Sequence, residues 1–474
     1  MEKKQRGSFT GRLGFVLAAA GSAIGLGNLW RFPYLAAKNG GGLFILVYII
    51  LSFTFGFSLM TTEIAIGRKT GLSPLEAYGK IKQKFKFLGV LATIVPIIIF
   101  PYYCVIGGWV TKYAATYAFG QAQDIYSTGV EVFFNGFITA NISPIFWFLI
   151  FMGLSAVVVL LGVEKGIEKA SKIIMPALFV LIIGIAIYSM TLSYTDPETG
   201  ETRTALDGLK IYLIPSFEGL TISKFFAILL DATSQLFYSL SIAMGILITY
   251  GSYCRKEDNL VTSVNQIEIF DTGIALLAGL IVVPTVFAFQ GYEGLEKSGP
   301  SLMFVSLPTV FEQMGSIGSL IGALFFILVL FAALTSSISL LETIASSIID
   351  KFGIKRSIAT LISFIASVVI GIIVCLGYNV LDTSITLPNG AQNQKLLDLL
   401  DYISNSLMLP IVALLTCLLV WCCKPKTIID EVKSGSNEKF RREKLYIVMI
   451  KYIAPILLAT ILLQAFNFFS FLDK

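Results

Sequence analysis

The stretch that decides the fold is Gly21-Ser22-Ala23-Ile24-Gly25-Leu26-Gly27-Asn28-Leu29-Trp30-Arg31-Phe32-Pro33, inside the first long apolar segment. Three glycines, at positions 21, 25 and 27, precede an amide, an arginine and a proline. Each glycine costs a helix roughly 1 kcal/mol relative to alanine, which predicts a helix that stops and restarts at membrane depth. Backbone carbonyl groups that lose their helical partners at the interruption would bind a cation. The N–H groups that begin the restarted half of the helix would bind an anion. The alternative is a glycine-rich packing face between helices.

Composition indicates an all-α integral membrane protein. Of the 474 residues, 55% are hydrophobic and 14% are charged, and a soluble protein of this size cannot bury that much apolar surface. The apolar runs last about 20 residues, as spanning helices do, whereas barrels alternate in shorter segments. We expect eleven transmembrane helices, at residues 12–37, 42–67, 88–117, 144–162, 170–193, 222–252, 260–288, 316–349, 356–379, 396–422 and 445–470.

Lysine and arginine gather on one side of this arrangement. The N-terminal segment and the loops after helices 2, 4, 6, 8 and 10 hold 25 of the 35. Basic loops stay in the cytoplasm, so we expect a plasma-membrane protein with a cytoplasmic N-terminus and an extracellular C-terminus. The predicted parts are a cytoplasmic N-terminal segment, a first five-helix repeat, an extracellular loop, a second five-helix repeat, a cytoplasmic loop, and helix 11 with the C-terminus, at residues 1–11, 12–193, 194–221, 222–422, 423–444 and 445–474.

A second interruption is predicted in helix 6, where hydroxyl groups cluster between Asp231 and Gly245. Five helices separate it from the interruption in helix 1. This spacing predicts two inverted five-helix repeats with broken helices 1 and 6, plus helix 11. The prediction depends on position and hydropathy, because the halves show no residue-level repeat.

Several polar residues lie at membrane depth, where they are functional or paired. We expect Glu63 to pair near the break in helix 1, and Asp271 to meet a cation or share a proton. Thr335 and Ser336, with the Ala332 carbonyl, form a possible oxygen cage for a hard cation. The alternative is that these hydroxyls bond back to their own helix.

Two further segments carry expectations of their own. Gly166 and Pro176 favour unwinding at the start of helix 5, or else an ordinary proline kink. Residues 291–313 are too polar to span, and we interpret them as an external hairpin that acts as a lid. The six cysteines have no metal or disulfide spacing. The absence of histidine removes the usual proton relay.

The chain resembles the neurotransmitter:sodium symporter family from about Arg6 to Phe466. Three motifs carry the resemblance: the stretch above with the preceding Ala19-Ala20, Gln235-Leu236-Phe237-Tyr238-Ser239-Leu240-Ser241, and Ala333-Leu334-Thr335-Ser336-Ser337. It is most similar to the bacterial amino-acid transporters of an eleven-helix subgroup, one of which carries leucine. The resemblance implies the inverted-repeat fold, a central site and a bacterial source.

The resemblance also implies ligand roles. A first sodium site would use the Ala23 carbonyl, Asn28, Ser239 and Asp271, and a second the Gly21, Ile24 and Ala332 carbonyls with Thr335 and Ser336. The substrate carboxylate would meet the Leu26 and Gly27 N–H groups and the Tyr103 hydroxyl. The implied substrate-binding residues are Ser22, Ala23, Leu26, Gly27, Ile99, Tyr103, Tyr238, Ser239, Ser241, Met244, Ser337 and Leu340. Since this pocket holds no charge, a neutral side chain is expected.

The resemblance also implies which residues would close the central site toward each side of the membrane. Arg31 and Asp401, with Tyr103 and Tyr238, would close the outside. The inside would be closed by Arg6, Asp350 and Tyr253, and helix 5 would unwind between Gly166 and Pro176 to hydrate the second sodium site.

Three departures from the family bear on specificity. Ser22 and Ala243 stand where the leucine-transporting member has Asn and Gly, which leaves the pocket size open. Asp271 replaces an asparagine, close to where chloride-dependent relatives bind the anion, near Tyr48, Gln235 and Ser239. A fixed carboxylate there would substitute for chloride. Glycine at position 25, where amine carriers have aspartate, leaves room for a substrate carboxylate.

The sequence therefore predicts a sodium-coupled symporter that imports neutral α-amino acids by alternating access, with two sodium ions and without chloride. Its expected partners are the substrate and the lipid bilayer, with no nucleic acid and no obligatory protein partner. One alternative is a proton-coupled transporter with Glu63 or Asp271 as proton carrier. Another is a sensor that binds an amino acid without moving it. An enzyme is not expected, because the sequence shows no nucleophile–base arrangement.

Overall fold

The computed structural model describes residues 7–197, 200–296, 299–434 and 440–468. The described chain is almost entirely helical. Its one small sheet is an antiparallel hairpin of β1 (Ser193–Thr195) and β2 (Thr202–Thr204). Short helices connect the long ones: α5 (Pro74–Ile81), α7 (Ala122–Thr128), α8 (Val130–Ile138), α11 (Ala205–Leu213), α15 (Leu307–Gln313) and α20 (Lys426–Lys433).

Among the described residues, nine helical stretches are long and apolar enough to cross a membrane, and a bent pair at the N-terminus raises the number to ten. Several of these stretches contain short π turns or a 3-10 turn, which are labelled η. The nine are α3 (Gly42–Leu51) with η2 (Ser52–Gly56) and α4 (Phe57–Thr70); η3 (Gln83–Phe85), a short 3-10 turn, with α6 (Lys86–Ala118); α9 (Ser143–Leu160); η4 (Val163–Glu168) with α10 (Lys169–Ser189); α14 (Leu260–Glu296); α16 (Ser316–Phe352); α17 (Arg356–Leu376); α18 (Leu396–Asp401) with η6 (Tyr402–Met408) and α19 (Leu409–Cys423); and α21 (Glu443–Val448) with η7 (Met449–Ile453) and α22 (Ala454–Ala465).

The predicted span 222–252 is divided into α12 (Ile222–Ser239) and α13 (Ile246–Gly251). Counted as one broken span, these two helices fit the expected arrangement of eleven.

The interruption predicted in helix 1 is confirmed. α1 (Arg12–Ala23) ends where Ile24 takes an extended conformation, with φ −76° and ψ 98°. The chain restarts as the π turn η1 (Gly27–Arg31) and α2 (Phe32–Lys38), bent by 54° from α1. The glycine-rich stretch is therefore a break and not a packing face of a continuous helix.

The interruption predicted in helix 6 is also confirmed. Ser241 and Ala243 have φ of 53° and 64°, a left-handed conformation that costs such residues about 1–2 kcal/mol. The Ala243 N–H donates to Glu63 Oε1 (2.8 Å), and Ser241 Oγ donates to the Ser22 carbonyl (3.0 Å). Glu63 was expected to pair near the break in helix 1, and its partner belongs to the adjoining break in helix 6. The carboxylate supports the break in helix 6, because α4 packs directly against α13.

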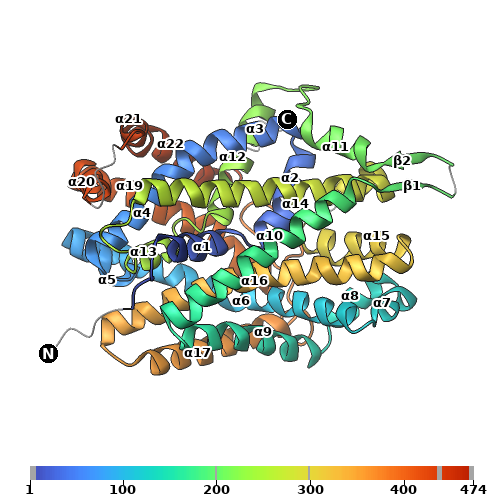
Figure 1. Cartoon of the computed structure of the whole chain (residues 1–474), viewed down its shortest axis with the longest axis horizontal. Helices are drawn as coiled ribbons and strands as arrows, with labels where there is room; N and C mark the ends of the chain where they lie inside the picture. The colour runs from blue at the N-terminus through green and yellow to red at the C-terminus, as the bar shows by residue number, and fades with distance from the viewer. Residues whose placement is uncertain (1–6, 198–199, 297–298, 435–439, 469–474) are drawn as a thin grey trace.

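The two breaks lie at the centre of the bundle. α1 contacts α10, α14 and α16, and Figure 1 shows it lying between the long helices α14 and α16. α5, α13 and α20 lie near one end of the molecule, and the hairpin β1–β2 with α7 and α15 lies at the other. Large apolar side chains such as Val157 on α9, Val180 on α10 and Val369 on α17 are exposed, as expected for surfaces that face lipid.

The segment 291–313, predicted as an external hairpin, is mostly helical. α14 continues through a non-helical Gly291 to Glu296, and the π turn η5 (Leu302–Ser306) leads into α15. Phe304 is fully buried, stacks on Phe134 with ring centroids 5.1 Å apart, and contacts Trp109. Aromatic packing thus holds this segment against the bundle, and its role as an external lid stays a prediction.

Candidate substrate and ion sites

A small cavity of about 30 Å³ lies between the two breaks, room for one or two water molecules. Nine of the twelve predicted substrate residues lie in its wall: Ser22, Leu26, Gly27, Ile99, Tyr103, Tyr238, Ser241, Met244 and Leu340. The wall also includes Gly25, Ile246, Ser336 and Asn405. The structure thus brings together residues from helices 1, 3, 6, 8 and 10.

Three predicted substrate residues do not line this cavity. Ala23 and Ser239 lie at the edges of the breaks. Ser337 faces α9, because its Oγ lies 2.6 Å from Ser155 Oγ and donates to the Leu334 carbonyl at 2.9 Å. Ser337 therefore joins two helices, and the structure gives no support to a substrate contact there.

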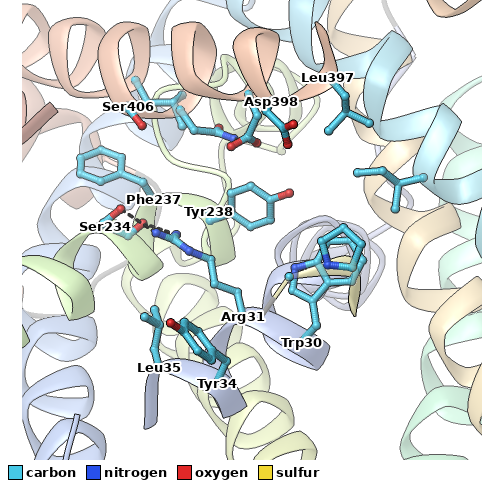
Figure 2. Close-up of a pocket in the computed structure, with 16 residues that line it drawn as sticks. Trp30, Arg31, Tyr34, Leu35, Ser234, Phe237, Tyr238, Leu397, Asp398 and Ser406 are labelled. Atoms are coloured by element: carbon cyan, nitrogen blue, oxygen red, sulfur yellow. Dashed lines mark hydrogen bonds between the residues drawn. The ribbon is translucent and has the colours of Figure 1, made fainter. Parts of the chain in front are cut away.

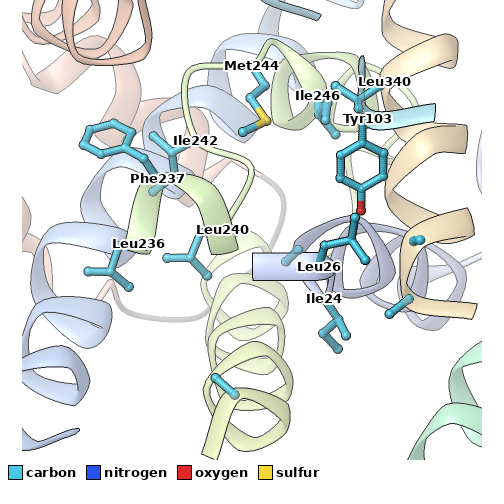
Figure 3. Close-up of a cluster of buried hydrophobic side chains, with 14 of the residues drawn as sticks. Ile24, Leu26, Tyr103, Leu236, Phe237, Leu240, Ile242, Met244, Ile246 and Leu340 are labelled. Atoms are coloured by element: carbon cyan, nitrogen blue, oxygen red, sulfur yellow. The ribbon is translucent and has the colours of Figure 1, made fainter. Parts of the chain in front are cut away.

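Tyr103 presents an unsatisfied polar atom at the cavity. Its hydroxyl is buried and has no hydrogen-bond partner among the described residues. Figure 3 shows the hydroxyl directed at Leu26, the residue just before the restarted half of helix 1. A Cβ at Gly25 would lie 2.8 Å from Ser336 Oγ and 3.1 Å from the Tyr103 hydroxyl. Glycine at position 25 thus preserves space beside free N–H groups at a helix start, where an anion binds.

Of the residues predicted for the first sodium site, Asn28 and Ser239 form one buried cluster around Asp271. Its Oδ1 accepts from Asn28 Nδ2 (2.7 Å) and Ser239 Oγ (2.6 Å). Its Oδ2 accepts from the Tyr48 hydroxyl at 3.2 Å. Asp271 is fully buried and takes part in no ion pair among the described residues. Because an isolated buried carboxylate is costly, this cluster is suited to a bound cation.

The residues predicted for the second sodium site meet where α16 crosses the break in helix 1. Ser336 Oγ donates to the Ser22 carbonyl (3.0 Å) and approaches the Ile24 carbonyl (3.4 Å). Thr335 Oγ1 donates to the Ala332 carbonyl at 3.0 Å. A Cβ at Gly21 would lie 3.3 Å from Thr335 Cβ, so glycine permits this close approach. Thr335 bonds back to its own helix, as the alternative reading expected, whereas Ser336 reaches across to helix 1.

A vestibule of about 310 Å³ lies next to the cavity, on the side predicted to face outward. Tyr238 and Asn405 line both spaces and separate them. Arg31 and Asp401 lie in the vestibule wall, but they form no ion pair. Arg31 donates to Ser234 Oγ (3.0 Å), as Figure 2 shows, and Asp401 accepts from Asn405 Nδ2 (2.6 Å). The predicted outer gate residues thus stand apart in this conformation.

At the end predicted to face the cytoplasm, Asp350 and Tyr253 bond to residues that were not predicted. Asp350 accepts from the Ser73 N–H at 2.6 Å, and Arg6 lies outside the described residues. Tyr253 donates its hydroxyl to Glu342 Oε1 at 2.6 Å. Arg356 donates to both oxygens of this fully buried carboxylate, at 2.6 and 2.9 Å. Sequence analysis missed Glu342, although an acidic residue inside the apolar run of helix 8 is a signal of its own.

The pair Arg356–Glu342 provides a stability prediction. Arg356→Gln leaves Glu342 buried without a cation, and we expect a loss of about 3–5 kcal/mol, measured as a lower midpoint of thermal unfolding in detergent. The matched control is Lys351→Gln, whose ion pair with Glu76 (3.0 Å) is partly exposed and contributes about 0–1 kcal/mol. Adding Glu342→Gln to Arg356→Gln should recover part of the loss. Equal midpoints for the two single variants would contradict the prediction.

Helix 5 is wound in this structure. η4 leads directly into α10, so both Gly166 and Pro176 lie in helical segments. A Cβ at Gly166 would collide with the Val158 carbonyl. Close packing therefore requires glycine at this position in the present conformation. Unwinding between the two residues stays a prediction for another conformation of the protein.

The chain is similar to known transporters over nearly its whole length. A model of the sodium:neurotransmitter symporter family matches residues 6–123 and 138–472. The sodium-dependent transporter YhdH of Bacillus subtilis is 32% identical, over 99% of this chain and 100% of that protein. A sodium-dependent transporter of Haemophilus influenzae is 30% identical, over 97% of this chain and 98% of that protein. The crystal structure of MhsT in complex with L-phenylalanine matches with a TM-score of 0.85 and 35% identity, covering 98% of this chain and 100% of that one.

Proposed function

The chain belongs to the sodium:neurotransmitter symporter family and is a sodium-dependent membrane transporter, and from that premise we propose that it imports neutral α-amino acids together with two sodium ions and without chloride. Its family and its structural neighbours are transporters and not enzymes.

The observation that carries the proposal is the buried carboxylate of Asp271. It has hydrogen-bond donors around it but no basic partner among the described residues. A cation bound beside Asn28 and Ser239 would neutralise it. Ala332, Thr335 and Ser336 offer oxygen ligands for a second ion, and hard cations prefer oxygen.

The groups around the cavity match the charged groups of an amino acid, for which the cavity has to widen from its present 30 Å³. The substrate's carboxylate would satisfy the Tyr103 hydroxyl and the free N–H groups that begin the second half of helix 1. Its ammonium would face carbonyl groups of the two breaks. MhsT, which this chain resembles over nearly its whole length, is described in complex with L-phenylalanine. The rest of the wall carries no charged side chain, which favours a neutral substrate.

The vestibule and the closed inner end suggest how the transport cycle proceeds. In the present conformation substrate would enter from the vestibule, past Tyr238, while Tyr253 and Glu342 hold the other end shut. Substrate and sodium would then favour approach of Arg31 to Asp401, and unwinding of helix 5 would release the ions inward. Ions drive such a cycle only through different affinities for its conformations.

The test is uptake of radiolabelled neutral amino acids into proteoliposomes. Sodium is replaced by potassium in one series and chloride by gluconate in another. We expect uptake that needs sodium and survives the removal of chloride. Uptake that survives the replacement of sodium would favour the proton-coupled alternative, and binding in detergent without uptake would favour a sensor.

Asp271→Asn tests the independence from chloride. Because the fixed negative charge is removed beside the bound cation, we expect uptake that requires chloride or is lost. The control is Asp231→Asn, since that carboxylate lies at the outer part of α12 near Lys38 (4.0 Å) and is partly exposed. The control should keep chloride-free uptake. Chloride-free uptake of normal rate in Asp271→Asn would reject the charge-balance role.

A further inference from the structure

Asn405 occupies an unexpected position between the cavity and the vestibule. It lies in the π turn η6 and lines both spaces. Its Nδ2 donates to Asp401 Oδ1 at 2.6 Å and to the Tyr102 hydroxyl at 3.1 Å. The residue therefore connects the outer gate with the substrate cavity.

The orientation of the amide follows from chemistry. An ionised carboxylate only accepts hydrogen bonds, so the amide atom beside Asp401 must be the nitrogen. This leaves the oxygen, Oδ1, on the remaining side of the group. Oδ1 is buried and has no hydrogen-bond partner among the described residues. An unpaired buried acceptor of this kind costs about 1–3 kcal/mol.

The other polar side chains of the cavity have a partner or an assigned role, which for Tyr238 is the outer gate between the cavity and the vestibule. Ser22, Ser241 and Ser336 bond to each other or to the Ser22 carbonyl. The Tyr103 hydroxyl is assigned above to the substrate carboxylate. The remaining wall is apolar, formed by Leu26, Ile99, Met244, Ile246 and Leu340.

We propose that Asn405 Oδ1 accepts a hydrogen bond from the side chain of the substrate. The substrate class is then narrower than neutral amino acids in general: it comprises those whose side chain carries a hydroxyl, amide or ring N–H donor. This inference rests on the proposed function. It gives Asn405 the role of a specificity-determining residue, because a substrate of equal shape without a donor leaves the oxygen unpaired.

The test compares amino acids of equal shape. Threonine and valine form one pair, and tyrosine and phenylalanine another. Each is used as an unlabelled competitor of sodium-driven uptake in proteoliposomes, with the best-transported amino acid as labelled tracer. In the wild-type protein we expect the donor-bearing member of the accepted pair to compete at least about tenfold better, since sites built to bond a hydroxyl reject analogues that lack it. Asn405→Leu should reduce this ratio to about one.

A matched control separates specificity from gating. Asn405 also contacts Asp401, so its replacement changes the gate as well. A gating effect alters both members of a pair equally and leaves their ratio unchanged. Ser404→Ala removes the contact of Ser404 Oγ with the Tyr102 hydroxyl (3.2 Å) in the same network, yet Ser404 does not line the cavity. This variant should keep the wild-type ratio.

The outcomes are distinguishable. Equal competition within both pairs by the wild-type protein would overturn the inference while leaving the proposed function in place, and this measurement needs no variant to fold. A wild-type ratio retained by Asn405→Leu would overturn it equally. Absence of sodium-driven uptake for every neutral amino acid would overturn the proposed function itself.

Discussion

Replacing Thr335 by valine should reduce sodium-driven uptake to background while leaving the protein folded. Valine keeps the shape of threonine and removes only its hydroxyl. In the present structure Thr335 Oγ1 bonds to the Phe331 (3.2 Å) and Ala332 (3.0 Å) carbonyls of its own helix. Loss of these local bonds costs little, because such hydroxyls contribute weakly within a helix. If the same oxygen is a ligand of sodium, its loss removes the ion that drives the transport cycle.

The matched control is Thr343→Val, two turns along the same helix. Thr343 is buried, and its Oγ1 donates to the Ser339 carbonyl at 2.8 Å. Both variants lose a buried hydroxyl bonded to α16, but only Thr335 faces the break in helix 1. Uptake and the thermal midpoint are measured for both. Normal uptake by Thr335→Val, or an equal loss in both variants, would rule out the second sodium site proposed here.

Replacing Tyr103 by phenylalanine should weaken substrate binding by about tenfold to a hundredfold without reducing stability. A hydrogen bond to a charged group contributes about 1.5–3 kcal/mol, and the substrate carboxylate would lose one. In the substrate-free protein the hydroxyl is buried and unpaired, so its removal should leave the thermal midpoint unchanged or raise it. Equilibrium binding of the best-transported amino acid and unfolding in detergent measure the two effects.

Tyr113→Phe is the control. It removes a hydroxyl from the same helix, but one that has a hydrogen-bond partner and lies outside the cavity wall. The Tyr113 hydroxyl donates to the Phe304 carbonyl at 3.2 Å, far from the cavity wall. Its loss should lower stability by about 1 kcal/mol and leave substrate affinity unchanged. A Tyr103→Phe protein that binds substrate normally would contradict the role given to the hydroxyl.

The two broken helices were predictable because their signals are local. Gly21, Gly25 and Gly27 weaken a helix at their own positions, whatever surrounds them. The partner of Glu63 was not predictable in the same way. A buried carboxylate signals that a partner exists, but only the packing of α4 against α13 decides that the partner is the Ala243 N–H.

Helix orientation limited the prediction of the site. Ser336 and Ser337 are adjacent and chemically alike, yet one faces the cavity and the other faces Ser155. Asn405 was missed because no motif includes it. Its spacing of four residues from Asp401 was the available signal, since residues at this spacing share a helix face. The packing of the segment 302–313 was not predictable, because its apolar residues are buried by aromatic rings from distant parts of the chain.

The strained backbone at Ser241 and Ala243 has a consequence for laboratory evolution. Selection for heat resistance favours substitutions that relieve backbone strain. In this protein such substitutions would fall within the proposed substrate site. A variant with a higher unfolding temperature obtained in this way would have a lower transport rate, as is common where activity depends on a destabilised segment. Stabilising substitutions for biochemical work should therefore be placed first on the exposed surfaces of α9 and α17, which lie away from both breaks.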